Sequence, residues 1–208
     1  MKRERRVKRV KSLAALAAMA TLAASLLGCP PEKRPACDPT TAGGDAARAH
    51  RLCNPHSVIL VRHAEKAPSE TKDPDLAPEG RARALRLATL LGKTAPARLV
   101  ATEYKRTQQT LAPLAERLQV ALEIRGAAQA KDLLRELRDA PPGSTTVVAT
   151  HANVLPLMVR ELGGAPLRDL DPEGMLAEND YGRVVVLSVG CSATASVVEL
   201  SSDPSPGP

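Results

Sequence analysis

Short apolar runs rich in β-branched residues alternate along the chain with longer segments in which apolar residues recur every three or four positions. The runs predict strands, and the longer segments predict helices. The predicted strands cover residues 57–62, 97–101, 120–124 and 145–150, and each is followed by a predicted helix, at 78–91, 105–118, 131–138 and 153–162. This alternation is typical of an α/β fold, here a three-layer α/β/α sandwich with a mostly parallel central sheet.

Two further apolar runs, at residues 182–189 and 196–200, are separated by Gly190 and a few small residues and predict a closing β-hairpin. The domain built from all these elements covers residues 56–201, a usual length for a single core. Residues 202–208 are rich in Ser, Pro and Gly and predict a disordered tail.

The first predicted helix has one apolar and one polar side. Its apolar positions are spaced i, i+3, i+4 and i+7, at Ala84, Leu87, Ala88 and Leu91. The basic residues on its other positions are expected in solvent: Arg81, Arg83, Arg86 and Lys93. Gly92 follows the last apolar position and is expected to end the helix in a left-handed conformation.

Residues 1–28 predict a signal peptide, because seven basic residues, with one acidic residue among them, precede an apolar run. The run has about 15 residues, whereas a spanning helix needs about 20, so an uncleaved membrane anchor is the less favoured alternative. It ends in Leu-Leu-Gly-Cys29, the pattern of a bacterial lipoprotein cleavage site, which makes Cys29 the predicted lipidation site. We therefore expect an exported protein of the bacterial cell envelope, attached to the membrane through its N-terminal lipid only and facing the periplasm in a Gram-negative cell.

Residues 29–55 have no hydrophobic periodicity and many Pro, Gly and Ala residues, so they predict a flexible tether between lipid and domain. Cys37 and Cys53 lie in this tether. In an oxidising compartment they are able to form a disulfide, and the sequence leaves the paired and the free state equally open. His50 and His56, in the tether or at its edge, are expected in solvent.

The positive charge of the chain belongs to the signal peptide. The leader holds seven of the 29 Lys and Arg residues and one of the 23 Asp and Glu residues, so the rest of the chain has 22 of each sign. A neutral mature protein offers no electrostatic basis for nucleic-acid binding. The chain also has no Phe and no Trp, so it lacks the usual aromatic platforms on which bases stack.

Two histidines and two arginines follow the predicted strands closely. Arg62 and His63 come at the end of the first strand, His151 follows the fourth, and Arg106 stands near the start of the helix after the second. Ligands of open α/β sheets bind beyond the carboxyl ends of parallel strands, so we expect these side chains at one edge of the sheet. A neutral imidazole attacks phosphorus, and guanidinium groups bind phosphoryl oxygens in pairs. The arrangement predicts a phosphoryl-transfer site.

Three motifs in this order, Arg62-His63-Ala-Glu, Tyr-Lys-Arg106-Thr-Gln-Gln-Thr and Thr-His151-Ala-Asn, resemble those of the histidine phosphatase superfamily, also called phosphoglycerate-mutase-like. The resemblance covers the chain from Val58 to about Leu162. It implies that the expected α/β/α sandwich has the phosphoglycerate-mutase-like fold of the family. It implies that His63 is the phosphorylated nucleophile. It also implies a phosphate-binding pocket, formed by Arg62, Arg106, His151 and Asn153. The neighbouring guanidinium charge would lower the pKa of the imidazole and keep it neutral near pH 7.

The general acid is the part of the family pattern without a clear counterpart in this chain. Many members carry a Glu after the second helix, where residues 123–130 offer no convincing match, and a related branch has Asp directly after the second His, where Ala152 stands. Glu65 is the remaining catalytic candidate. It either donates a proton to the leaving group, or it only pairs with Lys66 or caps a loop.

The start of the first helix also departs from the pattern. Leu76-Ala77-Pro-Glu-Gly80 resembles the family's Leu-Thr-x-x-Gly, with Ala77 where a capping hydroxyl is common. Loss of such a cap costs on the order of 1 kcal/mol of stability.

We therefore expect an enzyme, a phosphoric monoester hydrolase of the histidine phosphatase type, acting on a phosphorylated small molecule or on phosphohistidine in a protein. The alternative is a catalytically weak or inactive lipoprotein of the same fold that binds a phosphate ligand, which the missing acid favours. A mutase is expected least, because the chain lacks long insertions that would close a pocket against water.

No cofactor is expected, and no metal, because two histidines without a well-spaced carboxylate pair make a poor metal site. Selectivity for the substrate is expected in the loops at residues 67–75 and 164–179.

Overall fold

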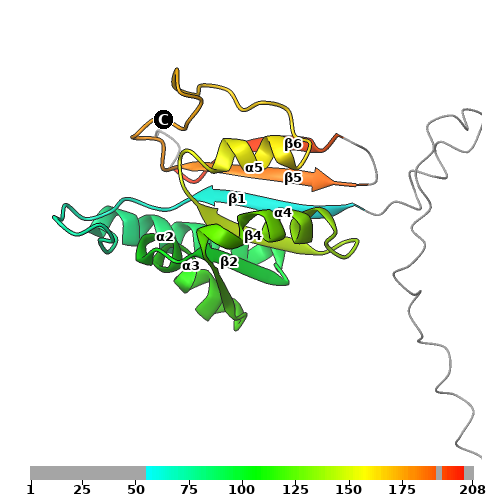
Figure 1. Cartoon of the computed structure of the whole chain (residues 1–208). Helices are drawn as coiled ribbons and strands as arrows, with labels where there is room; N and C mark the ends of the chain where they lie inside the picture. The colour runs from blue at the N-terminus through cyan, green and yellow to red at the C-terminus, as the bar shows by residue number, and fades with distance from the viewer. Residues whose placement is uncertain (1–54, 191–193, 204–208) are drawn as a thin grey trace, which may run out of the picture. The chain divides into compact units, whose positions relative to one another are not determined.

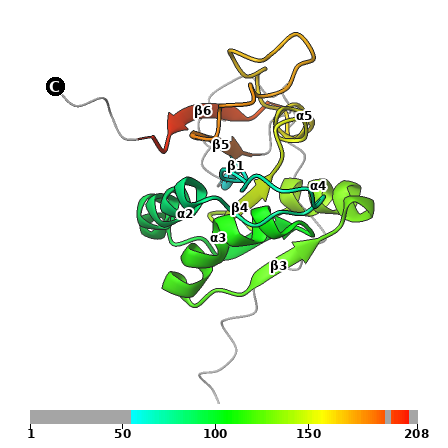
Figure 2. The same cartoon turned by 90° about the vertical axis from the view of Figure 1, so that its left-hand side faces the viewer.

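The structure, a computed structural model, describes residues 55–190 and 194–203. Six strands form one mixed sheet in the order β3-β2-β4-β1-β5-β6, with helices on both faces (Figure 1, Figure 2). The strands are β1 (His56–Arg62), β2 (Arg98–Thr102), β3 (Leu122–Arg125), β4 (Thr145–Thr150), β5 (Arg183–Val189) and β6 (Ser196–Ser201). The helices are α2 (Pro78–Leu91), α3 (Lys105–Leu118), α4 (Ala130–Arg138) and α5 (Leu155–Glu161), with 3-10 turns η1 (Gly92–Thr94) and η2 (Ala127–Gln129). The predicted three-layer α/β/α sandwich is confirmed.

The central part of the sheet is parallel, as the alternation of strands and helices predicts. β1 pairs with β4, β4 with β2, and β2 with β3, all in parallel. β5 and β6 form the predicted hairpin, and β5 joins the sheet antiparallel to β1. The carboxyl ends of β1, β2 and β4 therefore lie at one edge of the sheet.

The two faces of β1 belong to two different hydrophobic cores. Val58 and Leu60 pack with residues of α4 and α5 on one side of the sheet. Ile59 and Val61 pack with residues of α2 and α3 on the other side. A strand covered on both faces has apolar residues at every position, which explains why this segment is a continuous apolar run.

Helix α2 begins and ends differently from a helix with standard caps. Ala77 makes no side-chain cap hydrogen bond, as the sequence indicates. Gly80 lies against the backbone of Glu65, where a Cβ atom would overlap the Glu65 carbonyl oxygen. The helix ends at Leu91 as predicted, but the left-handed conformation expected at Gly92 is wrong: Gly92 has φ −60°, the chain tightens into η1, and Ala95 takes the left-handed conformation with φ 44°.

His56 is buried, which corrects the expectation that it lies in solvent. It begins β1 rather than ending a tether, and only 6% of its surface is exposed. Its Nε2 lies 2.7 Å from the Leu137 carbonyl oxygen of α4, so the imidazole donates a hydrogen bond across the core. The strand starts one residue earlier than predicted, and the side-chain alternation then directs His56 to the face that carries Val58.

Arg83 is also buried, although its place on the polar side of α2 predicts exposure. Its Nε and Nη2 donate to the Glu65 carboxylate at 2.7 to 3.0 Å, and its Nη1 donates to Asp203 at 2.6 Å. Ser202 is buried as well, and its N–H donates to the Gly182 carbonyl. Ser202 and Asp203, in the segment predicted as a tail, thus contact the domain through these hydrogen bonds.

The predicted signal peptide, lipidation site and tether, with the cysteine pair Cys37 and Cys53 and with His50, lie outside the described residues. Within the described ranges, no helix is long and apolar enough to cross a membrane.

Candidate active site

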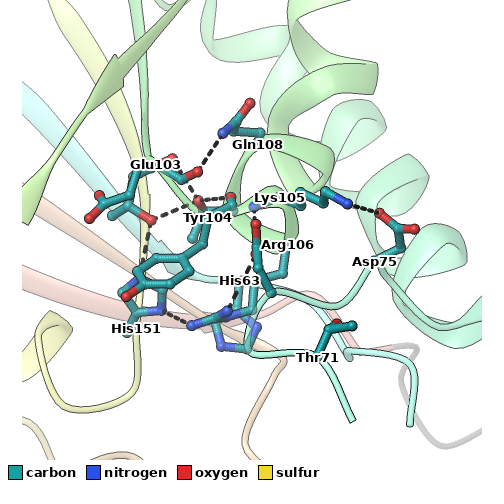
Figure 3. Close-up of polar contacts among 12 residues, drawn as sticks. His63, Thr71, Asp75, Glu103, Tyr104, Lys105, Arg106, Gln108 and His151 are labelled. Carbon is teal, nitrogen blue, oxygen red and sulfur yellow. Dashed lines mark hydrogen bonds and ion pairs between the residues drawn. The ribbon is translucent and has the colours of Figure 1, made fainter. Parts of the chain in front are cut away.

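Two histidines lie side by side where the parallel strands β1 and β4 end. Arg62 and Thr150 are paired across the two strands, so the next residue of each strand, His63 and His151, leaves the sheet at the same point. The N–H of His63 still donates to the Thr150 carbonyl at 2.9 Å. The two imidazole rings meet edge to face, with centroids 5.4 Å apart (Figure 3). The sheet register therefore brings together two residues that are far apart in the sequence.

The His63 imidazole is held as a neutral base with one free ring nitrogen. Its Nδ1 donates to the Ala64 carbonyl oxygen at 2.8 Å, which leaves the lone pair on Nε2. Burial lowers the pKa of His63 to about 3, and the positive charges of Arg106 and Arg62 act in the same direction. The ring is therefore uncharged at neutral pH, as a nucleophile must be.

His151 is fixed between β2 and the start of α3. Its Nε2 lies 3.1 Å from the Thr102 hydroxyl, and its Nδ1 accepts from Arg106 Nη2 at 3.5 Å (Figure 3). Burial, followed by the charge of Arg106, lowers the pKa of His151 to about 4. With Nδ1 as acceptor, Nε2 carries the proton and donates to Thr102.

Arg62, the last residue of β1, and Arg106, in the first turn of α3, lie beside the histidines. Arg62 Nη1 donates to the carbonyl oxygens of Ala177 and Asp180, at 2.7 and 3.1 Å, and burial lowers its pKa. Arg106 Nη1 lies 3.8 Å from the Asp73 carboxylate. The Nε of each arginine is buried and has no hydrogen-bond acceptor among the described residues. An unpaired buried donor costs about 1–3 kcal/mol, so both groups favour an anionic ligand whose oxygens would accept from them.

The start of α3 is tied to the loop that follows β1. The N–H of Ala64 donates to the Thr110 hydroxyl at 2.9 Å, and this hydroxyl donates to the Arg106 carbonyl oxygen at 2.6 Å. Asp73 caps α3 from outside by accepting the Lys105 N–H at 3.0 Å. These contacts fix the position of Arg106 relative to His63.

The two tyrosines of the chain both lie at this site, and the sequence interpretation missed them. Tyr104 covers the Arg106 guanidinium at 4.3 Å and meets the His151 ring at 5.2 Å. Tyr181 covers the Arg62 guanidinium at 4.1 Å and lies 6.0 Å from the His63 ring. A guanidinium stacked on an aromatic face is attracted by the ring and is restricted in its motion. The full chain has no Phe or Trp and only these two Tyr residues. This scarcity is the one sequence feature that sets the two tyrosines apart.

Glu65 pairs with Arg83, not with Lys66 as one of the two interpretations expects. Partial burial alone would raise the pKa of the Glu65 carboxyl, but its hydrogen bonds, those with Arg83 first, together with the charges of Arg83 and Arg86 hold the pKa below its usual value. A general acid at neutral pH needs the opposite shift. The geometry therefore favours Glu65 as a structural anion that positions the loop after His63.

Asn153, the last predicted phosphate-binding residue, is exposed two positions after His151. Its side chain forms no hydrogen bond with Arg62, His63 or Arg106 in the structure, so its role stays a prediction. In the described part of the chain, no group of three or more His, Cys, Asp or Glu residues is arranged to hold a metal ion.

Residues 58–128 match the sequence model of the histidine phosphatase superfamily (branch 1). This segment contains Arg62, His63 and Arg106, while His151 lies outside it. No curated protein is significantly similar to the chain in sequence.

Several solved structures share the fold. The protein histidine phosphatase SixA, solved with tungstate, has a TM-score of 0.55 at 17% identity, over 70% of this chain and 97% of that one. A mycobacterial glucosyl-3-phosphoglycerate phosphatase has a TM-score of 0.54 at 14% identity, over 71% of this chain and 98% of that one. A candidate phosphohistidine phosphatase SixA from Nakamurella multipartitia has a TM-score of 0.51 at 23% identity, over 73% of this chain and 98% of that one. At these identities the similarity establishes the phosphoglycerate-mutase-like fold.

Proposed function

We propose that this chain is a member of the histidine phosphatase superfamily and hydrolyses a phosphomonoester or a phosphohistidine through a covalent intermediate on His63. The observation that carries the proposal is the pair of buried, unpaired Nε groups of Arg62 and Arg106 beside a neutral imidazole. Donors for phosphoryl oxygens and a nucleophile for phosphorus thus occur at one site.

The reaction would proceed in two displacements. In the first, the lone pair of His63 Nε2 attacks phosphorus, the bond from phosphorus to the leaving oxygen or nitrogen breaks, and the leaving group departs with that electron pair and takes up a proton. In the second, water attacks the phosphohistidine, gives a proton to solvent and releases phosphate, while Nε2 regains its lone pair. Arg62 and Arg106 would bind the phosphoryl oxygens in both steps, and His151 would position Arg106 through its Nδ1.

The proton for the leaving group would come from solvent rather than from Glu65, since Arg83 keeps the Glu65 carboxyl ionised. Substrates with good leaving groups are therefore favoured. Phosphohistidine is one, because its imidazole takes up a proton on the second ring nitrogen before the phosphorus–nitrogen bond breaks. The SixA structures that share this fold are described as phosphohistidine phosphatases, which supports the same substrate class here.

The alternative function is a protein that binds a phosphorylated ligand without turnover. The pairing of Glu65 with Arg83 favours this alternative, because it removes the remaining candidate for a proton donor. Binding of the phosphoryl group would then use the same arginines.

The test is hydrolysis of p-nitrophenyl phosphate and of phosphohistidine by the purified full chain, together with trapping of an acid-labile phosphoenzyme. We expect His63→Asn to lower kcat by about 10³-fold or more and to abolish the phosphoenzyme. The control is His56→Asn, which also removes a buried imidazole but lies outside the site and should retain activity. If wild type and His63→Asn are equally inert toward both substrates while inorganic phosphate still binds, the phosphatase proposal is wrong and the binding function remains.

A further inference from the structure

A cavity of about 420 Å³ lies beside His151, between α4 and α5 on one face of the sheet. Both helices lie on the same side of the sheet (Figure 1). Most of the lining from these helices and from the segment before α5 is apolar and includes Leu133, Leu134, Val154, Leu157 and Met158. We propose that this cavity is a subsite for an apolar leaving group, so that the substrate is a phosphate ester of an apolar phenol, which departs without a proton donor from the protein. The assignment of a leaving group rests on the proposed phosphatase function, whereas the binding of an apolar tail does not.

The cavity borders the phosphoryl site. His151, Tyr104 and Thr102 line the cavity; His151 and Tyr104 contact Arg106, and Thr102 is within hydrogen-bond distance of His151. His151 lies 5.4 Å, between ring centroids, from the proposed nucleophile His63. A group attached to a phosphoryl moiety held between these two imidazoles therefore starts at the edge of the cavity.

A second cavity, with a polar lining, also borders the phosphoryl site. A space of about 550 Å³ is lined by Arg106, Tyr181 and the charged residues Lys66, Lys72 and Glu178. Arg106 lines this polar cavity, and His151, which accepts a hydrogen bond from Arg106, lines the apolar cavity. A substrate with a charged phosphoryl end and an apolar tail matches this division.

The charged residues around the apolar cavity are exposed to solvent or ion-paired, so none of them is an unpaired charge buried beside an apolar ligand. Glu103, Arg160 and Glu161 are exposed to solvent. Arg125 is paired with Glu123 and Glu136, at 3.2 and 3.1 Å.

The connection from β3 to α4 also contributes small apolar residues to the cavity. Gly126, Ala127 and Ala130 line it at the segment where relatives commonly carry a catalytic Glu. These three residues contribute no carboxylate of their own and offer surface for an apolar tail, while the exposed Glu103 carboxylate accepts from the Ala127 N–H at 3.4 Å. A polar leaving group would lose hydrogen bonds to water here without regaining them.

Binding is tested with n-alkylphosphonates from methyl to octyl, whose carbon–phosphorus bond the reaction does not break. Calorimetry on the full chain should show Kd falling about twofold to fourfold for each added methylene until the cavity is filled. Leu157→Gln should weaken octylphosphonate binding by about fivefold to tenfold and leave methylphosphonate binding within about twofold. Leu157 is 49% exposed, so its replacement should not prevent folding.

The matched control is Leu85→Gln on α2, which changes a similarly exposed leucine outside the cavity, 61% exposed. It should leave the whole phosphonate series unchanged. A second variant, Ala130→Trp, fills the cavity from an exposed position and should shorten the longest tail that still improves binding. A Kd that is independent of chain length, or equal effects of Leu157→Gln and Leu85→Gln, would overturn the inference.

Turnover is tested with phenyl phosphates that carry 4-alkyl groups of increasing length, since the leaving-group pKa is nearly constant along this series. We expect kcat/KM to rise with alkyl length in wild type and to rise less in Leu157→Gln. Hydrolysis at a rate independent of tail length overturns the subsite and leaves the phosphatase proposal intact. Binding that depends on tail length without any hydrolysis overturns the phosphatase proposal and leaves the apolar subsite.

Discussion

The two site histidines make the stability of the folded chain depend on pH. In the folded state the pKa of His63 is lowered to about 3 and that of His151 to about 4, from an ordinary value of 6.5. Between these values and 6.5 the unfolded state binds more protons than the folded state. The free energy of unfolding therefore rises with pH through this window. The stabilisation contributed by the two neutral histidines is complete above about pH 6.5 and is lost on acidification.

We predict that His63→Asn reduces this pH dependence. Near pH 5 to 6 the unfolding of wild type should be coupled to the uptake of about two protons by the two histidines. Unfolding of the variant should be coupled to the uptake of about one proton. Urea unfolding at several pH values between 4.5 and 7.5 gives the slope of the unfolding free energy against pH. Equal slopes for the two proteins would contradict the burial of a neutral imidazole at position 63.

At the residue scale, the sequence identifies His63, His151, Arg62 and Arg106 because each stands close to the end of a predicted strand. Their convergence is then a consequence of parallel pairing, which the structure bears out. The contribution of Tyr181 was not predictable in the same way. Its ring reaches Arg62 from a loop more than 100 positions away, and only the folded chain places the two together.

Arg83 shows a second limit of sequence patterns. A charged residue on the polar side of a helix is usually exposed, and here two carboxylates from distant segments cover it. Nothing in the local sequence of α2 indicates either partner.

At the scale of elements, the periodicity predicts every strand and α-helix of the described domain and misses mainly their ends. β1 begins one residue earlier than predicted because His56 pairs with Val189 of β5, a contact between distant parts of the chain. The bounds of α2 are as predicted, and only the conformation after it differs, because the chain continues into η1 before turning at Ala95. Element ends depend on neighbours in space, whereas element cores depend on local patterning.

The close approach of α2 to the loop after β1 gives a prediction for Gly80. Ala is the better helix former, so Gly80→Ala would stabilise an isolated helix. In the folded chain the added methyl group overlaps the Glu65 carbonyl oxygen. We expect Gly80→Ala to lower the free energy of unfolding by about 1–3 kcal/mol, measured by chemical denaturation.

The control for this substitution is Gly126→Ala, because a Cβ atom at Gly126 meets no atom within 4 Å. That variant should stay within about 0.5 kcal/mol of wild type. If both variants have the same stability, the close packing of α2 on the Glu65 backbone is not what constrains residue 80.

At the scale of the whole molecule, the predicted cellular localisation depends on residues outside the described ranges. We propose that the chain is exported and lipidated on Cys29, on the basis of the leader and of the Leu-Leu-Gly-Cys29 sequence. Expressed in a bacterial host, wild type should fractionate with membranes and enter the detergent phase. Cys29→Ala should lose this partitioning, while Cys37→Ala should keep it. Equal membrane association of Cys29→Ala and wild type would contradict the lipid anchor.

The placement of the two tyrosines has an optical consequence. With no Trp and no Phe in the chain, these two phenol rings are its only aromatic chromophores apart from the weakly absorbing imidazoles. Both are stacked on the arginines of one pocket. Their fluorescence and near-ultraviolet dichroism should therefore respond to an oxyanion at this pocket, so that occupancy is readable without any attached label.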